Sequence, residues 1–174
     1  RDLAGAIARA ADADVLVTIG GASVGERDLV TGALTRAGLQ LSFAKVAMRP
    51  GKPVFAGMLG STRVLGLPGN PVSAFICSMV FLLPMLHGLL GTNAAIVPQQ
   101  AVLASALPEN GPRQNYQRAT STFACDGTRH VRVLSSQDSS LMAALAHADC
   151  LIVQPPHAPA LPAGTKVLVL PLVG

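Results

Sequence analysis

The order of apolar and polar positions divides the chain into two parts of different character. In the first part, apolar runs of strand length alternate with stripes of helical period, as in layered α/β proteins. Helices are predicted at 1–11, 28–37 and 74–90, and strands at 13–19, 41–48, 54–59 and 62–67. The run at 13–19 is continuously apolar and β-branched, which is typical of a strand buried on both faces of a mostly parallel sheet.

After residue 93 the pattern changes to short β-type runs separated by Pro and Gly clusters. Only 139–148 has a helical pattern; strands are predicted at 101–107, 115–123, 130–135, 150–154 and 166–173. The fold class predicted is therefore α/β in two domains. A layered, mostly parallel sheet unit occupies 1–93, and a small all-β, barrel-like domain occupies 94–174.

Composition favours a packed, aliphatic protein. Half of the residues are hydrophobic, 13% are charged and 3% are aromatic, so wholesale disorder is excluded. The apolar run 74–90 is interrupted by Pro84 and His87 and falls short of the roughly 20 residues of a spanning helix. We therefore predict a buried helix, no membrane contact and a cytoplasmic location. The three widely spaced cysteines, Cys77, Cys125 and Cys150, are predicted to be small buried residues in a reducing compartment.

The charge balance points to anions in general. The formal net charge is +4 and the sequence pI is about 9.4. Nucleic acid is disfavoured because the sequence has no Lys/Arg run and no aromatic stacking platform. A small phosphorylated or oxyanionic substrate fits the same charge.

The segment 20–28 has the residues of a phosphate-binding loop between a strand and a helix. Glycines let the backbone N–H groups approach an anion closely, and a hydroxyl adds a donor; the residues are Gly20, Gly21, Ser23 and Gly25. The spacing matches neither the Walker loop nor the dinucleotide fingerprint. Glu26 and Asp28 would repel a phosphate unless a cation such as Mg²⁺ bridged them. The alternative is a tight turn in which Asp28 caps the helix.

A second loop of the same kind precedes the helix at 74–90. Its candidate binding residues are Pro68, Gly69, Asn70 and Ser73. Asn70 also suits the N-cap position and Pro71 the first helical position, so a plain capped helix start is the alternative.

Three cations lie between the two loops. Lys45 and Arg49 are four residues apart and would point to one face of an extended strand, and Lys52 follows across a turn. Together they could clamp an oxyanion. The alternative is a solvated basic edge that discourages aggregation.

The stretches "GGASVGERD", "FAKVAMRPGKP" and "GLPGNPVSA", in this order, resemble the molybdopterin molybdenumtransferase family, which includes MoeA and the E domain of gephyrin. The resemblance is strong over 1–92 and looser over the C-terminal β-domain. It implies an enzyme of molybdenum cofactor biosynthesis, a transferase that inserts molybdate into adenylylated molybdopterin and releases AMP.

The resemblance also implies roles for individual residues. Gly20, Gly21, Ser23, Gly25, Pro68, Gly69, Asn70 and Ser73 would bind the nucleotide-pterin substrate. Asp28 matches the family's essential acid and would hold Mg²⁺ or orient a water, and Lys45, Arg49 and Lys52 match its basic cluster. Arg49 stands where some members carry Lys, which keeps the charge but changes the geometry.

Family members carry a long segment before the part that resembles this chain. The resemblance therefore implies a C-terminal portion whose α/β unit is incomplete at its N-terminus and which lacks part of its site. It also implies a homodimer in the full-length protein. Two alternatives remain open: a molybdopterin adenylyltransferase, which shares the α/β unit, and a non-catalytic scaffold or binding module of the same fold.

Overall fold

The structure, a computed structural model, describes residues 3–21, 29–92, 96–137 and 145–172. The chain forms two compact units. The first comprises Arg1–Val46 and Gly51–Leu82, and the second comprises Ala47–Pro50 and Leu83–Gly174. The sequence-based boundary between residues 93 and 94 stays a prediction.

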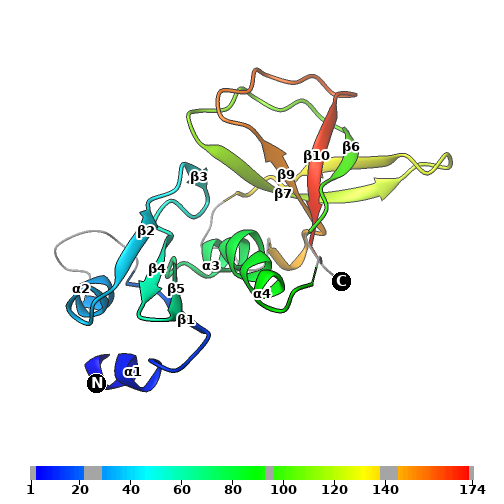
Figure 1. The fold of residues 1–174 in the computed structure, drawn as a ribbon. Coiled ribbons are helices and arrows are strands. Elements are labelled where there is room, and N and C mark those ends of the chain that lie inside the picture. The colour runs from blue at the N-terminus through cyan, green and yellow to red at the C-terminus, as the bar shows by residue number, and fades with distance from the viewer. Residues whose placement is uncertain (1–2, 22–28, 93–95, 138–144, 173–174) are drawn as a thin grey trace. The chain divides into compact units, whose positions relative to one another are not determined.

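The first unit is built on a four-stranded sheet in the order β1-β5-β4-β2 (Figure 1). The strands are β1 (Val15–Ile19), β2 (Gln40–Ala44), β4 (Phe55–Leu59) and β5 (Thr62–Leu67). Helices and sheet together confirm the α/β class, but the expectation of a mostly parallel sheet is wrong for the described strands. Only β1 and β5 are parallel, whereas β4 pairs antiparallel with both β5 and β2.

The reason lies in the connections. A two-residue turn, Gly60 and Ser61, joins β4 to β5, and a turn this short returns the chain antiparallel to itself. Gly60 supplies the positive φ of 59° that such a turn requires. The predicted strand 41–48 is also divided, since β2 ends at Ala44 and β3 (Met48–Arg49) joins the other sheet.

Helices α1 (Leu3–Arg9) and α2 (Leu29–Arg36) pack on this sheet through one apolar core. The buried residues of the core come from both helices, from the strands and from the loop after α2: Ile7, Ala33, Leu34, Leu39, Phe55 and Val64. A fully buried aliphatic or aromatic side chain contributes about 1.5–3 kcal/mol relative to an exposed one, so this cluster contributes strongly to the stability of the first unit.

The predicted long helix is continuous but changes character along its length. It runs through α3 (Pro71–Cys77), a π-helical segment, η1 (Ser78–Leu82), and α4 (Leu83–Leu89). The prediction of burial is confirmed for most of α3 and is wrong for α4, which has no buried residue. Pro84 lies in the first turn of α4, where its missing N–H is best tolerated.

By length and apolar composition alone, Pro71–Leu89 could cross a membrane, and 28% of it is buried. Core helices of soluble proteins pass the same test, so this is weak evidence. The absence of membrane contact stays a prediction.

The second unit is a β-barrel. Five strands close it in the order β7-β8-β6-β10-β9, with β7 and β9 paired across the seam. They are β6 (Gln99–Leu103), β7 (Gln114–Phe123), β8 (Arg129–Val133), β9 (Cys150–Gln154) and β10 (Lys166–Pro171), and β3 adds to β7 outside the ring. The barrel-like domain is thereby confirmed. Most of the helix predicted at 139–148 lies outside the described residues.

The barrel core is aliphatic, as the composition required. Its buried members line the inside of all five strands and one loop: Ala101, Leu103, Leu107, Ala119, Val131, Cys150, Ile152 and Val169. Figure 1 shows the β7–β8 hairpin, drawn in yellow, extending past the other strands of this unit.

The cysteines divide into two kinds. Cys77 and Cys150 are buried, and burial raises the pKa of each thiol to about 12. The prediction of burial is wrong for Cys125, which is exposed in the turn between β7 and β8. A turn at the end of an extended hairpin has no core beneath it to cover a side chain.

Gly66 gives the most direct test of the first core. A Cβ at this position would overlap the ring of Phe55, which is fully buried. Because the ring has no free space to move into, Gly66→Ala is expected to lower the free energy of unfolding by about 1–3 kcal/mol. Denaturant titration followed by circular dichroism measures the change.

The matched control is Gly32→Ala within α2, where the nearest neighbour of an added Cβ is an Arg36 nitrogen at 3.5 Å. This change should stabilise the protein by about 0.5–1 kcal/mol, because alanine favours a helix interior. Equal effects from the two substitutions would show that Phe55 does not occupy the space above Gly66.

Candidate functional site

The candidate site lies at one end of the sheet in the first unit. One row of paired residues crosses all four strands near this end: Thr18 of β1, Gly66 of β5, Phe55 of β4 and Ala44 of β2. Directly beyond the row come the loop after β1, the loop after β5, and the turn that joins β2 to β4. Strand spacing places β1 and β2 about 14 Å apart along this edge.

The two glycine loops approach each other at backbone distance. A methyl group added at Gly69 would lie 3.2 Å from the Cα of Gly20, closer than nine in ten real contacts of that kind. The Gly20 N–H donates to the carbonyl of Leu67 at 3.0 Å, which ties the first loop to the end of β5. Gly20 and Gly21 have φ values of 82° and 66°, a conformation that other residues rarely adopt. Ends of adjacent parallel strands are where open α/β sheets bind ligands.

The second loop also caps a helix. Asn70 is extended and its side-chain Oδ1 accepts from the Ser73 N–H at 3.2 Å, as an N-cap residue does. The Ser73 hydroxyl donates to the same oxygen at 3.4 Å, and Ser73 is 6% exposed. Capping of the helix thus explains the hydrogen bonds between the Asn70 and Ser73 side chains. That these side chains contact a substrate stays a prediction.

Lys45 and Lys52 lie beside each other at the same sheet end. The N–H of Lys45 donates to the Val54 carbonyl at 3.0 Å, and the N–H of Val46 donates to the Lys52 carbonyl at 2.9 Å. Both lysine side chains are exposed. Lys45 has a φ of 63°, which breaks the extended strand that the sequence predicted. The backbones of the two lysines are therefore brought together by a turn and not by alternation along one strand.

Arg49 belongs to the second unit. It forms part of β3, where it pairs in parallel with Asn115 of β7. The side chain is exposed. Its grouping with Lys45 and Lys52 stays a prediction.

Ser23, Gly25 and Asp28 lie outside the described residues. The residues that flank this segment are tied together, since the Thr31 hydroxyl in α2 donates to the Gly21 carbonyl at 3.2 Å. Sequence reasoning did not single out Thr31, although a hydroxyl in the first turn after a glycine loop is a recognisable signal.

The described residues of the first unit supply no carboxylate at this sheet end. Asp12 and Asp14 precede β1 and so lie at the opposite end. Nor do the described residues contain a group of three His, Cys, Asp or Glu side chains that could hold a metal. The predicted binding of Mg²⁺ therefore depends on Asp28 and on oxygens of the substrate. This binding stays a prediction.

Thr18 is a further candidate that the sequence reasoning missed. Its hydroxyl oxygen is buried and has no hydrogen-bond partner in the described part of the chain. A polar residue near the end of an otherwise apolar strand was the available signal. The next residue, Ile19, is 69% exposed, which is unusual for a residue in the middle of an apolar segment.

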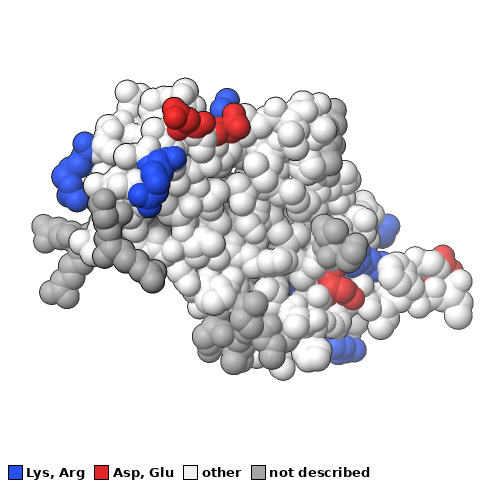
Figure 2. Space-filling view, turned by 90° about the horizontal axis from the view of Figure 1, so that it is seen from below, with Lys and Arg blue, Asp and Glu red and all other residues white. Residues whose placement is uncertain are grey.

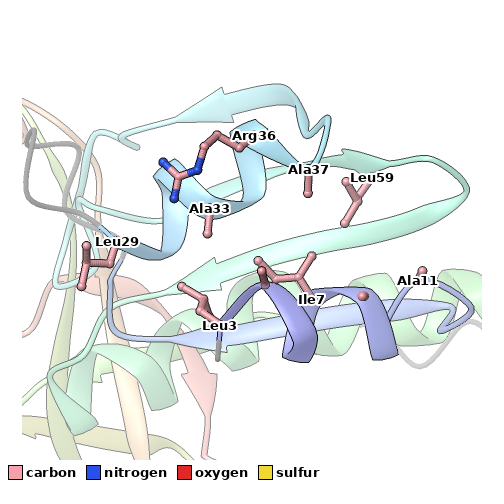
Figure 3. Close-up of a pocket in the computed structure, with 10 residues that line it drawn as sticks. Leu3, Ile7, Ala11, Leu29, Ala33, Arg36, Ala37 and Leu59 are labelled. Carbon is pink, nitrogen blue, oxygen red and sulfur yellow. The ribbon is translucent and has the colours of Figure 1, made fainter. Parts of the chain in front are cut away.

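A separate groove lies between α1 and α2 (Figure 3). Its volume is about 530 Å³, and its walls are apolar apart from Arg36, with Leu3, Ile7 and Leu29 among the lining residues. None of the predicted site residues that the structure describes lines it. It lacks the convergent polar groups that a substrate site needs to orient its ligand.

Figure 2 shows one face of the molecule, on which charged side chains are few and acidic and basic ones lie next to each other in places. That face has no continuous basic stripe of the kind that follows a nucleic-acid backbone.

Comparison with known proteins defines the class of each part. Residues 1–88 match the model of the probable molybdopterin binding domain, and residues 100–172 match that of the MoeA C-terminal region, domain IV. The chain belongs to the molybdopterin molybdenumtransferase family. This confirms the resemblance that the three sequence motifs indicated.

Two relatives show how much of the sequence this chain shares with known proteins. The molybdopterin molybdenumtransferase of Haemophilus influenzae is 33% identical over 167 residues, which cover 95% of this chain and 41% of that protein. Molybdopterin molybdenumtransferase 2 of Mycobacterium tuberculosis is 33% identical over 146 residues, 76% of this chain and 36% of that protein. The chain thus spans about two fifths of the length of these relatives.

Solved structures show the same fold. The molybdopterin biosynthesis MoeA protein from Pyrococcus horikoshii superimposes with a TM-score of 0.76 at 23% identity, over 100% of this chain and 41% of that one. A molybdenum cofactor biosynthesis protein from Pyrococcus furiosus gives a TM-score of 0.64 at 25% identity, over 83% and 54%.

The close approach of the two loops can be tested by enlarging one of them. Gly69→Ala forces the loops apart by a few tenths of an ångström, because its methyl group would meet backbone and not a movable side chain. We expect the affinity for AMP, measured by calorimetry, to fall about three- to tenfold, since backbone donors act only at hydrogen-bond distance.

Gly111→Ala is the control, because an added methyl group there meets nothing within 4 Å. It should leave AMP affinity unchanged. If Gly69→Ala binds AMP as tightly as the unmodified chain, the loop pair is not the anion site.

Proposed function

We propose that this chain is the substrate-binding and C-terminal part of an enzyme that inserts molybdate into adenylylated molybdopterin and releases AMP. The observation that carries the proposal is the convergence of two glycine loops and two lysines at one end of a single sheet. The names of the relatives support the same reaction.

The loops would hold the phosphate portion of the substrate. Backbone N–H groups near Gly20, Gly21 and Gly69 can approach an anion without side chains in the way. Their donors are fixed before the substrate arrives, so charge that develops on phosphate oxygens is stabilised without reorganisation.

The cations would hold molybdate. Molybdate is a dianion and must come close to an already anionic substrate, so positive charge is needed between the two. Lys45 and Lys52 would supply it as flexible point charges, and Arg49 would add two-pronged contacts to oxyanions. Asp28 would hold Mg²⁺, and the metal would supply positive charge that stabilises the charge developing on phosphate oxygens. Magnesium, a homodimer and a cytoplasmic location remain parts of this proposal.

The alternative function, that of a molybdopterin adenylyltransferase, is less well supported. The described barrel and the match of residues 100–172 to domain IV favour the molybdenumtransferase. The non-catalytic alternative differs in a measurable way, since a scaffold would bind ligand without releasing AMP.

Removing one lysine charge tests the molybdate role. In the full-length protein, Lys45→Gln should raise the molybdate concentration needed for half-maximal AMP release about tenfold, the loss expected for one charge-assisted contact. The control is Arg63→Gln, which removes one positive charge from an exposed residue at the opposite sheet end, beside Val15. Equal effects of both substitutions would mean that only net charge matters.

Asp28→Asn tests the catalytic step in the same assay. The amide keeps the size of the side chain but loses the negative charge that would hold Mg²⁺, so AMP release should stop while adenylylated molybdopterin still binds. Undiminished release by this variant would contradict the role of Asp28. Intact binding with no release by the unmodified protein would favour a scaffold.

A further inference from the structure

A second cavity lies in the β-barrel unit and is lined by groups unrelated to the sheet-end site. Its volume is about 340 Å³. The walls come from β6, β10 and the end of the β7–β8 hairpin, and the residues that matter here are Gln100, Val102, Phe123, Thr128, Arg129 and Lys166.

Arg129 forms the inner wall of this cavity, and its side chain is 11% exposed. Its Nη1 donates to Gln99 Oε1 at 2.7 Å, and its guanidinium lies over the Phe123 ring, 5.8 Å from the centroid. Its Nη2 is 3.7 Å from a carboxylate oxygen of Asp149. These contacts fix the guanidinium plane but leave Nε, which is buried, without a hydrogen-bond partner in the described part of the chain.

Lys166 supplies a second positive charge. It is exposed at the start of β10, where it pairs with Val102 of the neighbouring β6. Its ammonium group has no hydrogen bond or ion pair with any described residue. Two cations, one held by several contacts and one exposed, therefore line the same cavity.

No described residue that lines this cavity is acidic. One carboxylate oxygen of Asp149 forms an ion pair with Arg129, so part of the positive charge is balanced. Asp149 lies next to Arg129, but the Ser121 N–H and hydroxyl each donate to its other oxygen at 2.9 Å. Asp126, in the hairpin turn, accepts from the Thr128 N–H at 2.9 Å.

The remaining walls suit the body of an organic ligand. Phe123 is 70% exposed, with Arg129 near one face of its ring. Val102 adds an aliphatic wall, and Gln100 and Thr128 add side chains that can donate hydrogen bonds. An aromatic ring left open to solvent beside two cations is suited to a flat, negatively charged molecule.

We propose that this cavity binds a small organic anion, with its carboxylate or phosphate head between Arg129 and Lys166 and its planar body against Phe123. The residues that line this cavity differ from those of the loop pair, and the proposal does not depend on the proposed reaction. Neither family match assigns a ligand to it.

The test uses the whole chain, uniformly labelled with nitrogen-15 and titrated with three probes: phenyl phosphate, benzoate and inorganic phosphate. We expect amide shifts at 99–102, 127–129 and 166 to saturate with phenyl phosphate or benzoate. Inorganic phosphate, which lacks the planar body, should bind at least about tenfold more weakly. The ratio of the two organic affinities tells whether a phosphate or a carboxylate head is preferred.

Lys166→Met is the decisive variant, because it keeps the length of an exposed side chain and removes only its charge. It should weaken binding of the better organic probe about tenfold. Arg132→Met, an exposed cation on β8 that does not line the cavity, should bind within twofold of the unmodified chain. The proposal would be overturned if amides shifted only elsewhere, or if no shift saturated by 10 mM probe, roughly the weakest affinity of interest. Equal losses of affinity in both variants would overturn it as well.

Discussion

The candidate site depends on one constraint, the close approach of two backbone segments at the ends of paired parallel strands. Gly20 follows β1 and Gly69 follows β5, and no side chain fits between them. Because the two strands are parallel, both loops leave the sheet at the same edge. Their N–H groups can then face one anion. The pairing of β2 with β4 and of β4 with β5 places the two lysines, which follow β2 and precede β4, at the same edge.

Local patterns were sufficient to predict the parts of this arrangement. Glycine-rich loops after apolar strands, a helix beginning Asn70-Pro71, and a later region of short strands could be recognised because each depends on residues close together in the sequence. The barrel class followed from the same signals. The family resemblance then gave the loops and cations a common substrate, and the comparisons confirmed that family.

Long-range pairing could not be predicted in the same way. The two-residue turn after Leu59 is a local signal for the antiparallel pairing of β4 with β5, and the prediction missed it. The apolar pattern alone does not help, because an antiparallel strand buried on both faces has the same pattern as a parallel one. Lys45 was expected to share a strand face with Arg49, but the positive φ at Lys45 ends the strand. Arg49 instead joins the barrel sheet through a pairing with Asn115, 66 residues away in the sequence. Cys125 was expected to be buried because most cysteines are, and only the hairpin geometry shows otherwise.

The two units contribute different chemistry. The first has backbone donors and flexible lysines suited to phosphate and oxyanion groups, and the second has a rigid guanidinium beside an open aromatic ring. The barrel also holds β3, so the turn that carries Arg49 is shared between the units.

The central claim is that the two loops and the two lysines form one anion site. Amide spectra of the whole chain, recorded during titration with AMP, test it most directly. The account predicts that the amides of Gly20, Gly21, Gly69, Asn70, Lys45 and Lys52 shift together with a single dissociation constant. Separate constants for the loops and the lysines, or shifts confined to other parts of the chain, would contradict it.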